Sequence, residues 1–150
     1  SSDMTQPDLL QPQAEMQPEL ASPGVVNDDR AAVAAAPVIQ QSVIDELYEI
    51  MEEDFFGLLQ TFLEAAPPLV REIEAGVLDA DCDAVIMPAH SLKSSSANVG
   101  ALALSDVARQ MEMAARDGDV SRLSALVELI GEQWSAAESA LRRLCEHGIN

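Results

Sequence analysis

Apolar residues recur every three or four positions along residues 120–144, and this period constrains the fold more than any other feature. The repeating residues are Val120, Leu123, Val127, Ile130, Trp134, Ala137, Leu141 and Leu144. An α-helix has about 3.6 residues per turn, so this spacing places all eight side chains on one face of a long helix. Such a face is stable only when another element covers it. The sequence therefore predicts that the chain ends in a helix packed within a bundle.

The same period continues upstream through residues 42–119, where no convincing strand alternation occurs. Ser42 predicts the N-cap of a short helix over about 43–51. A second helix follows, in which Pro67-Pro68 predicts a kink and Gly76 predicts the end.

A third helix is expected to begin at an Asp79 or Asp81 N-cap and to run to about Val99. Gly100 supplies its stop, since glycine tolerates the left-handed conformation that commonly ends a helix. Pro88 lies inside this segment and predicts an irregular first half.

A fourth helix is predicted to end at Gly118, after which Asp119 caps the last one. The apolar face of this fourth helix consists of Leu104, Val107, Ala108, Met111 and Ala115. Because the connections between the long helices are short, neighbours must run antiparallel. We therefore predict an all-α fold: an up-down-up-down four-helix bundle with a short leading helix.

Residues 1–41 differ in composition from the rest of the chain. They hold five of the eight prolines, no aromatic residue, and six acidic residues against one arginine. Such a segment has too little bulky apolar surface to offset the entropy lost on ordering. We predict a flexible Pro/Ala/Gln-rich linker over 1–41 and a bundle over 42–150. Because the chain begins with Ser rather than Met, we expect it to be part of a longer protein.

The charge of the chain excludes several classes of partner. It carries 26 acidic and 8 basic residues, a formal net charge of −18. That charge repels phosphate backbones and disfavours contact with an anionic membrane surface, so we expect no nucleic acid and no direct membrane contact. No apolar stretch is long enough to cross a bilayer, and no secretory leader opens the chain. Two distant cysteines, Cys82 and Cys145, favour a reducing compartment, and we expect a cytoplasmic protein.

The third predicted helix carries a histidine away from its apolar face. At 100° per residue, His90 points about 140° from the centre of the apolar stripe, so it should face solvent. Lys93, the chain's only lysine, lies one turn further on the same side. A cation beside an exposed imidazole suits a small dianion at or near the ring. Ser94 and Ala97 are small and Met87 lies one turn back, which leaves room for a docking partner.

Residues 89–101 read Ala-His-Ser-Leu-Lys-Ser-Ser-Ser-Ala-Asn-Val-Gly-Ala. This string resembles the signature of histidine-containing phosphotransfer domains, roughly H-x-L-K-G-S/A-S/A-x-x-x-G-A. The matching positions are His90, Leu92, Lys93, Ser95, Ser96, Gly100 and Ala101. The resemblance extends over about 42–147. Ser94 stands where the family usually has Gly, and serine is small enough that the departure bears on partner preference rather than on docking itself.

The resemblance implies a phosphocarrier rather than an enzyme with its own ATP-using site. His90 would be the phosphoacceptor, and an unperturbed histidine titrates near 6.5, so a neutral nucleophilic ring is available near pH 7. Lys93 would stabilise charge on the phosphoryl oxygens, and Met87, Ser94 and Ala97 would border the docking surface.

The partners implied by the resemblance are receiver domains of response regulators or of a hybrid histidine kinase, between whose aspartates the group passes in a multistep relay. We expect a monomer without a cofactor or metal of its own, with Mg²⁺ held by the receiver. The linker composition suits the C-terminal domain of a hybrid sensor kinase, which would tether the domain to a membrane-bound parent.

Three other functions fit parts of the sequence less well. A hydrolase would use His90 with Ser91 and Asp83, but no G-x-S-x-G elbow occurs and the three residues lie along one helix. A metal-binding bundle would need Glu three residues before a histidine, and neither histidine has one. A non-phosphorylated helical adaptor is the main alternative, and the presence of both His90 and Lys93 argues against it.

Overall fold

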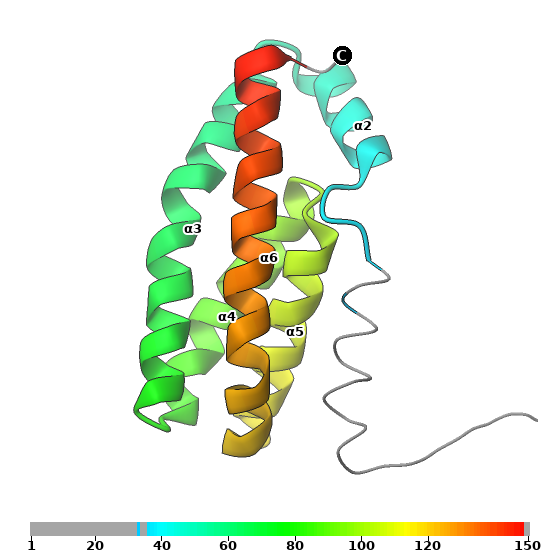
Figure 1. The fold of residues 1–150 in the computed structure, drawn as a ribbon. Coiled ribbons are helices and arrows are strands. Elements are labelled where there is room, and N and C mark those ends of the chain that lie inside the picture. The colour runs from blue at the N-terminus through cyan, green and yellow to red at the C-terminus, as the bar shows by residue number, and fades with distance from the viewer. Residues whose placement is uncertain (1–32, 34–35, 149–150) are drawn as a thin grey trace, which may run out of the picture.

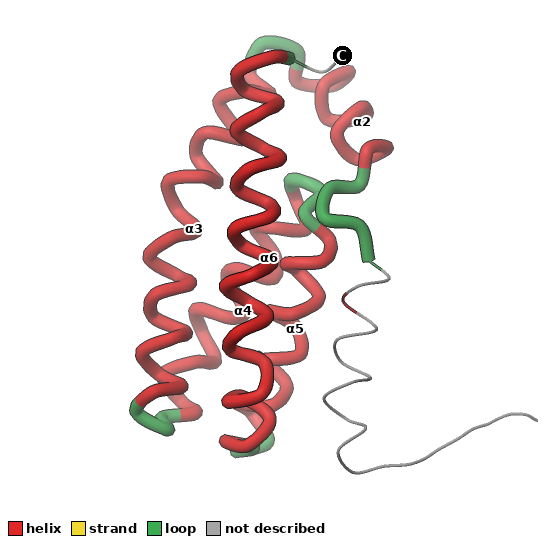
Figure 2. The backbone as a smooth tube through the Cα atoms, viewed as in Figure 1, coloured by secondary structure: helices red, strands yellow, loops and turns green. Residues whose placement is uncertain are grey.

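The structure is a computed structural model that describes Val33 and residues 36–148, and all regular structure in this part of the chain is helical. The helices are α2 (Gln41–Met51), α3 (Asp54–Leu78), α4 (Cys82–Asn98), α5 (Leu102–Arg116) and α6 (Val120–His147). Figure 1 shows α3 to α6 side by side as an antiparallel bundle, with the short α2 near the C-terminal end of α6. Short turns connect the helices (Figure 2). The predicted fold class is confirmed.

Each long helix packs against two others. The α4 and α6 helices each contact both α3 and α5. The interior they enclose is mostly aliphatic, and its largest buried side chains include Leu59, Ile73, Leu92, Leu104, Met111, Ile130 and Leu141. Because α6 contacts two neighbours, its buried face is wider than the predicted stripe and also includes Leu126 and Leu129, whereas Val120 is exposed. None of the described helices is long and apolar enough to span a membrane.

Prolines do not break the helices that contain them. Pro67 and Pro68 lie inside α3, and Pro88 lies inside α4, yet each helix continues on both sides. Each proline costs a backbone hydrogen bond, but packing stabilises the turns around it. Ala66 and Val70 of α3 are buried on either side of the proline pair. The α3 helix is therefore continuous through the proline pair at which the kink is predicted.

The prediction that Gly76 ends the second helix, α3, is wrong. The α3 helix runs on to Leu78, and Gly76 is buried within its last turns. A Cβ atom on Gly76 would lie 2.7 Å from Cγ2 of Val85 on α4. The missing side chain therefore allows α3 and α4 to approach each other closely.

The predicted helix caps and stops are largely confirmed. The Asp81 carboxylate accepts a hydrogen bond of 3.2 Å from a first-turn amide of α4, and Asp119 accepts one of 3.0 Å at the start of α6. Gly100 follows α4 with φ of +77°, and Gly118 follows α5 with φ of +70°. Both glycines occupy the left-handed region that ends a helix.

The segment before α2 contacts the turn between α4 and α5. The Gln40 amide donates to the Gly100 carbonyl at 2.7 Å, and the Ala103 amide donates to the Pro37 carbonyl at 2.9 Å. The predicted Ser42 N-cap is wrong, because α2 already begins at Gln41. These contacts fall within the segment predicted to be a linker, of which residues 1–32 and 34–35 lie outside the described part of the chain.

Candidate functional site

The α4 helix separates a buried face from an exposed face that carries His90. Its buried side consists of Val85, Pro88, Ala89, Leu92 and Ser96. The His90 side chain is 47% exposed. The predicted orientation of this helix is therefore confirmed.

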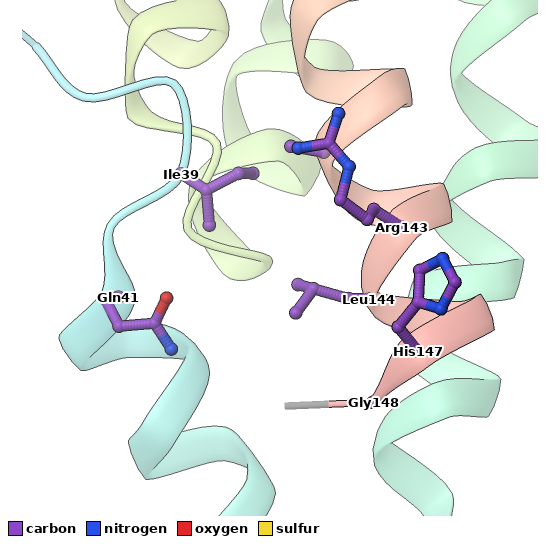
Figure 3. A pocket seen from close by; sticks show the side chains of 7 residues that line it. Ile39, Gln41, Arg143, Leu144, His147 and Gly148 are labelled. Carbon is purple, nitrogen blue, oxygen red and sulfur yellow. The ribbon is translucent and has the colours of Figure 1, made fainter. Parts of the chain in front are cut away.

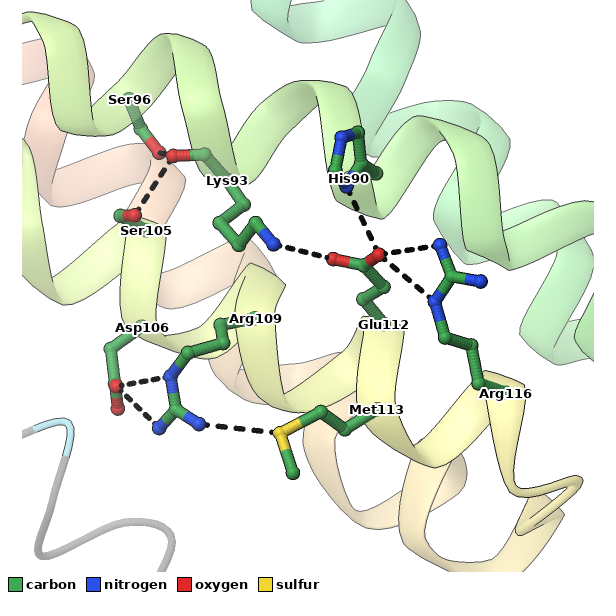
Figure 4. A network of polar contacts seen from close by, with 9 residues as sticks. All are labelled: His90, Lys93, Ser96, Ser105, Asp106, Arg109, Glu112, Met113 and Arg116. Carbon is green, nitrogen blue, oxygen red and sulfur yellow. Dashed lines mark hydrogen bonds and ion pairs between the residues drawn. The ribbon is translucent and has the colours of Figure 1, made fainter.

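A buried carboxylate on the neighbouring helix α5 holds the exposed ring (Figure 4). Oε2 of Glu112 lies 3.0 Å from Nδ1 of His90, and Oε1 lies 2.9 Å from Nζ of Lys93. Arg116, one turn further along α5, donates to Oε2 from Nε at 3.0 Å and from Nη2 at 2.8 Å. The Glu112 side chain is only 8% exposed. Three side chains from two helices thus converge on one carboxylate.

Glu112 is ionised over the whole physiological pH range. Burial by itself raises the pKa of this carboxyl, but hydrogen bonds from Lys93, Arg116 and His90 outweigh it and lower the pKa to about 2. An ionised carboxylate only accepts hydrogen bonds. The contact with His90 must therefore be donated by the ring.

This contact fixes the tautomer of His90. Since Glu112 accepts, Nδ1 carries the proton, and in the neutral ring Nε2 then holds the free lone pair. Within residues 36–148, Nε2 has no hydrogen-bond partner. The site thus presents a ring nitrogen with a free lone pair on a half-exposed side chain, while the other ring nitrogen donates to Glu112.

The charges around His90 leave an excess of one positive charge. Lys93 and Arg116 are cations, and the Glu112 carboxylate compensates only one of them. The chain as a whole carries a formal net charge of −18, so the sum of these three charges is opposite in sign to the net charge of the chain. Such a neighbourhood attracts an anionic group at the ring.

The three predicted docking residues are exposed. Met87 precedes His90 by less than one turn of α4, and Ser94 and Ala97 follow it. The neighbouring Ser96 is buried and donates to a carbonyl of its own helix, while Ser105 of α5 donates to the Lys93 carbonyl at 2.8 Å. The Ser105 hydrogen bond joins α5 to α4 beside the site.

The structure does not assemble the residues of a hydrolase triad. The orienting contact of His90 comes from Glu112, and no hydrogen bond joins the ring to Ser91 or Asp83. In the described part of the chain, no group of three or more His, Cys, Asp or Glu side chains is placed to hold a metal ion.

An open groove of about 410 Å³ lies elsewhere, between the segment before α2 and the end of α6 (Figure 3). Its lining consists of Ile39, Gln41, Ala140, Arg143, Leu144, His147 and Gly148. None of these residues belongs to the site at His90.

Glu112 was not found from the sequence, although a signal was present. Ala108 precedes it by four residues and Ala115 follows it by three, and both belong to the predicted apolar face of that helix. Residues at these spacings lie next to one another on a helix. A carboxylate between two core alanines therefore indicates a buried acid that needs cationic partners.

Comparison with known proteins agrees with this arrangement. A family model described as the Hpt domain matches residues 57–146. A solved structure, histidine-containing phosphotransfer protein B (HptB) from Pseudomonas aeruginosa PAO1, has 28% sequence identity and a TM-score of 0.70, and the match covers 75% of this chain and 97% of that chain. Comparison with curated protein sequences found no match. Since the family model spans more than half of the chain and includes His90 with its partners, the chain belongs to the Hpt domain family, the histidine phosphotransfer domains of two-component phosphorelays.

Proposed function

We propose that His90 accepts a phosphoryl group on Nε2 from the aspartyl phosphate of one receiver domain and passes it to an aspartate of another. One observation carries this proposal. Oε2 of the ionised Glu112 lies 3.0 Å from Nδ1 of His90 and fixes the ring proton there, so the lone pair lies on Nε2 of a half-exposed ring. Membership of the Hpt family supports histidine phosphotransfer in general.

The transfer step needs no proton exchange with solvent. The Nε2 lone pair attacks phosphorus, the P–N bond forms, and the P–O bond to the donor aspartate breaks with release of its carboxylate. The ring keeps its Nδ1 proton and becomes positively charged, which the adjacent Glu112 carboxylate stabilises. An attacking aspartate of the second receiver reverses the same steps. Positioning and charge therefore account for this chain's share of catalysis.

Lys93 is proposed to stabilise the phosphoryl oxygens. Its ammonium group has three N–H donors and lies on the same helix as His90, one turn away. Because Glu112 is already engaged by three side chains, we place no metal on this chain and assign Mg²⁺ to the receiver.

The receiver is proposed to dock over Met87, Ser94 and Ala97, which flank His90 on the exposed face of α4. We propose that the domain acts there as a monomer, since one α4 face carries both the phosphoacceptor and the surface around it.

The two histidines of the chain provide a test with a matched control. A radiolabelled phosphorylated receiver domain is incubated with the unmodified chain, with His90→Gln, and with His147→Gln, whose histidine lies at the end of α6. We expect acid-labile, alkali-stable label on the unmodified chain and on His147→Gln, and none on His90→Gln. Thermal stability of His90→Gln should change little, because the half-exposed ring adds little to the core and Gln keeps an N–H donor for Glu112. Label on His90→Gln would refute the assignment, and absence of label with several donors would favour the adaptor.

A further inference from the structure

The buried Glu112 carboxylate has two cationic partners, and they contact different oxygens. Lys93 approaches Oε1 alone at 2.9 Å. Arg116 donates to Oε2 through two nitrogens, at 2.8 and 3.0 Å, on the oxygen that also binds His90. One cation would be enough to neutralise one carboxylate, so the second calls for an explanation.

We propose that Arg116 is a positioning residue that keeps Glu112 compensated while Lys93 moves from Glu112 to the phosphoryl group. This inference rests on the proposed function of His90. In the unmodified chain Lys93 is bound to Glu112, as Figure 4 shows, and can stabilise phosphoryl oxygens only when it leaves that carboxylate.

The geometry makes Lys93 the cation that can leave. A lysine ammonium is a point charge on a flexible four-carbon stem, whereas the planar arginine fork makes several fixed hydrogen bonds. Arg116 has two such bonds to Oε2 and comes from α5, the helix that carries Glu112. Lys93 has one contact, from α4, the helix that carries His90. Its movement would therefore leave the Arg116–Glu112–His90 contacts intact.

Without Arg116, Lys93 would be the only strong cation on a carboxylate that is 8% exposed. Its departure would leave that buried anion beside a phosphoryl dianion, and an uncompensated buried charge is strongly unfavourable. Lys93 would therefore remain on Glu112. Loss of Arg116 should slow phosphoryl transfer because it keeps Lys93 away from the phosphoryl group. In a chain that already lacks Lys93, loss of Arg116 should cause no further slowing.

The chain offers a matched control for the loss of this arginine. Arg142 pairs with Glu138 four residues earlier on α6 at 3.0 Å, and its side chain is 52% exposed. Arg116 pairs with Glu112 at the same spacing at 2.8 Å and is 55% exposed. Arg142→Ala therefore removes the same charge and the same type of helical ion pair without touching the site.

The test measures initial rates of phosphoryl transfer from a phosphorylated receiver to six chains. They are the unmodified chain, Arg116→Ala, Arg116→Lys, Arg142→Ala, Lys93→Ala and the Lys93→Ala/Arg116→Ala double variant. We expect Arg116→Ala to slow transfer roughly five- to tenfold, a coupling of the size found within one ion-pair network. Arg142→Ala should match the unmodified chain, and the double variant should be no slower than Lys93→Ala alone. Arg116→Lys should restore most of the rate. Equal rates for Arg116→Ala and Arg142→Ala would overturn the proposal. So would a double variant whose slowing equals the product of the slowing in Lys93→Ala and in Arg116→Ala.

Two further measurements separate this proposal from other effects of the substitution. Phosphoramidate, a small donor without a docking surface, should show the same slowing with Arg116→Ala; slowing with the receiver alone would assign Arg116 to docking instead and refute the proposal. Thermal unfolding checks each fold, and Arg116→Gln, which keeps a donor for Glu112 but loses the charge, replaces Arg116→Ala if that variant is unfolded. If the unmodified chain takes no label from either donor, the function proposed for His90 fails instead.

Discussion

His90 has two ring nitrogens, and the structure gives them different surroundings. Nδ1 lies 3.0 Å from the Glu112 carboxylate, whereas Nε2 has no hydrogen-bond partner among the described residues. A histidine without such a neighbour samples both neutral tautomers, and only one of them has its lone pair on Nε2. Glu112 therefore favours the tautomer with its lone pair on Nε2 before any partner binds.

Glu112 also makes the free energy of unfolding depend on pH in acidic solution. Its pKa falls from an ordinary 4.5 to about 2 in the folded chain, so the folded state binds the proton less tightly than the unfolded state. The resulting stabilisation is complete above about pH 5 and is lost as pH falls towards 2. A shift of that size corresponds to at most about 3.5 kcal/mol at about 1.4 kcal/mol per unit.

Chemical denaturation of Glu112→Gln between pH 2 and 7 measures this contribution. We expect the difference in unfolding free energy between the unmodified chain and Glu112→Gln to shrink as pH falls from about 5 to 2. Glu138→Gln serves as the control, since Glu138 pairs with Arg142 at a more exposed site. A difference that is constant across this pH range would show that Glu112 is not the ionised partner described above.

At the scale of single helices, much of the structure could be predicted because the determining signals are local. The direction of His90 follows from the apolar residues of its own helix, and the caps Asp81 and Asp119 act on amides a few residues away. Gly76 could not be assigned in this way. Whether a glycine ends a helix or allows close packing depends on the facing helix, and the facing residue Val85 is identified only by the fold.

Two glycines of α3 test this explanation. Gly76→Ala places a Cβ 2.7 Å from Val85, so we expect a loss of about 1–3 kcal/mol in unfolding free energy from overpacking. Gly57→Ala meets nothing within 4 Å and should stabilise the chain by about 0.5–1 kcal/mol, because alanine favours the helix. Urea denaturation of both variants measures these changes in unfolding free energy. Equal effects of the two substitutions would mean that Gly76 is not a packing glycine.

At the scale of the whole molecule, the site forms only when α4 packs on α5. His90 and Glu112 are 22 residues apart in sequence, and no local pattern states that they meet. The sequence predicted the bundle and the exposed imidazole, because periodicity determines both. It did not predict the shared carboxylate, because tertiary packing alone brings Glu112, Lys93 and Arg116 together.

The segment before α2 belongs to the packed molecule and should add to its stability. Val38 and Ile39 pack on the core, and backbone hydrogen bonds join Pro37 and Gln40 to the α4–α5 turn. We expect a chain that begins at residue 42 to be less stable than one that begins at residue 36 by about 2 kcal/mol, from lost apolar burial. Thermal unfolding of the two chains measures the difference. Identical midpoints would mean that these contacts contribute nothing to folding.

The most direct test of the account is to identify the nitrogen that carries the phosphoryl group. The chain is labelled with ¹⁵N-histidine and phosphorylated by a receiver domain, and the ¹⁵N–³¹P couplings and ring shifts are measured by NMR. Because Nδ1 is held by Glu112, the account predicts a P–N bond to Nε2 of His90, with the Nδ1 proton retained. A bond to Nδ1, or a phosphoryl group on any residue other than His90, would contradict it.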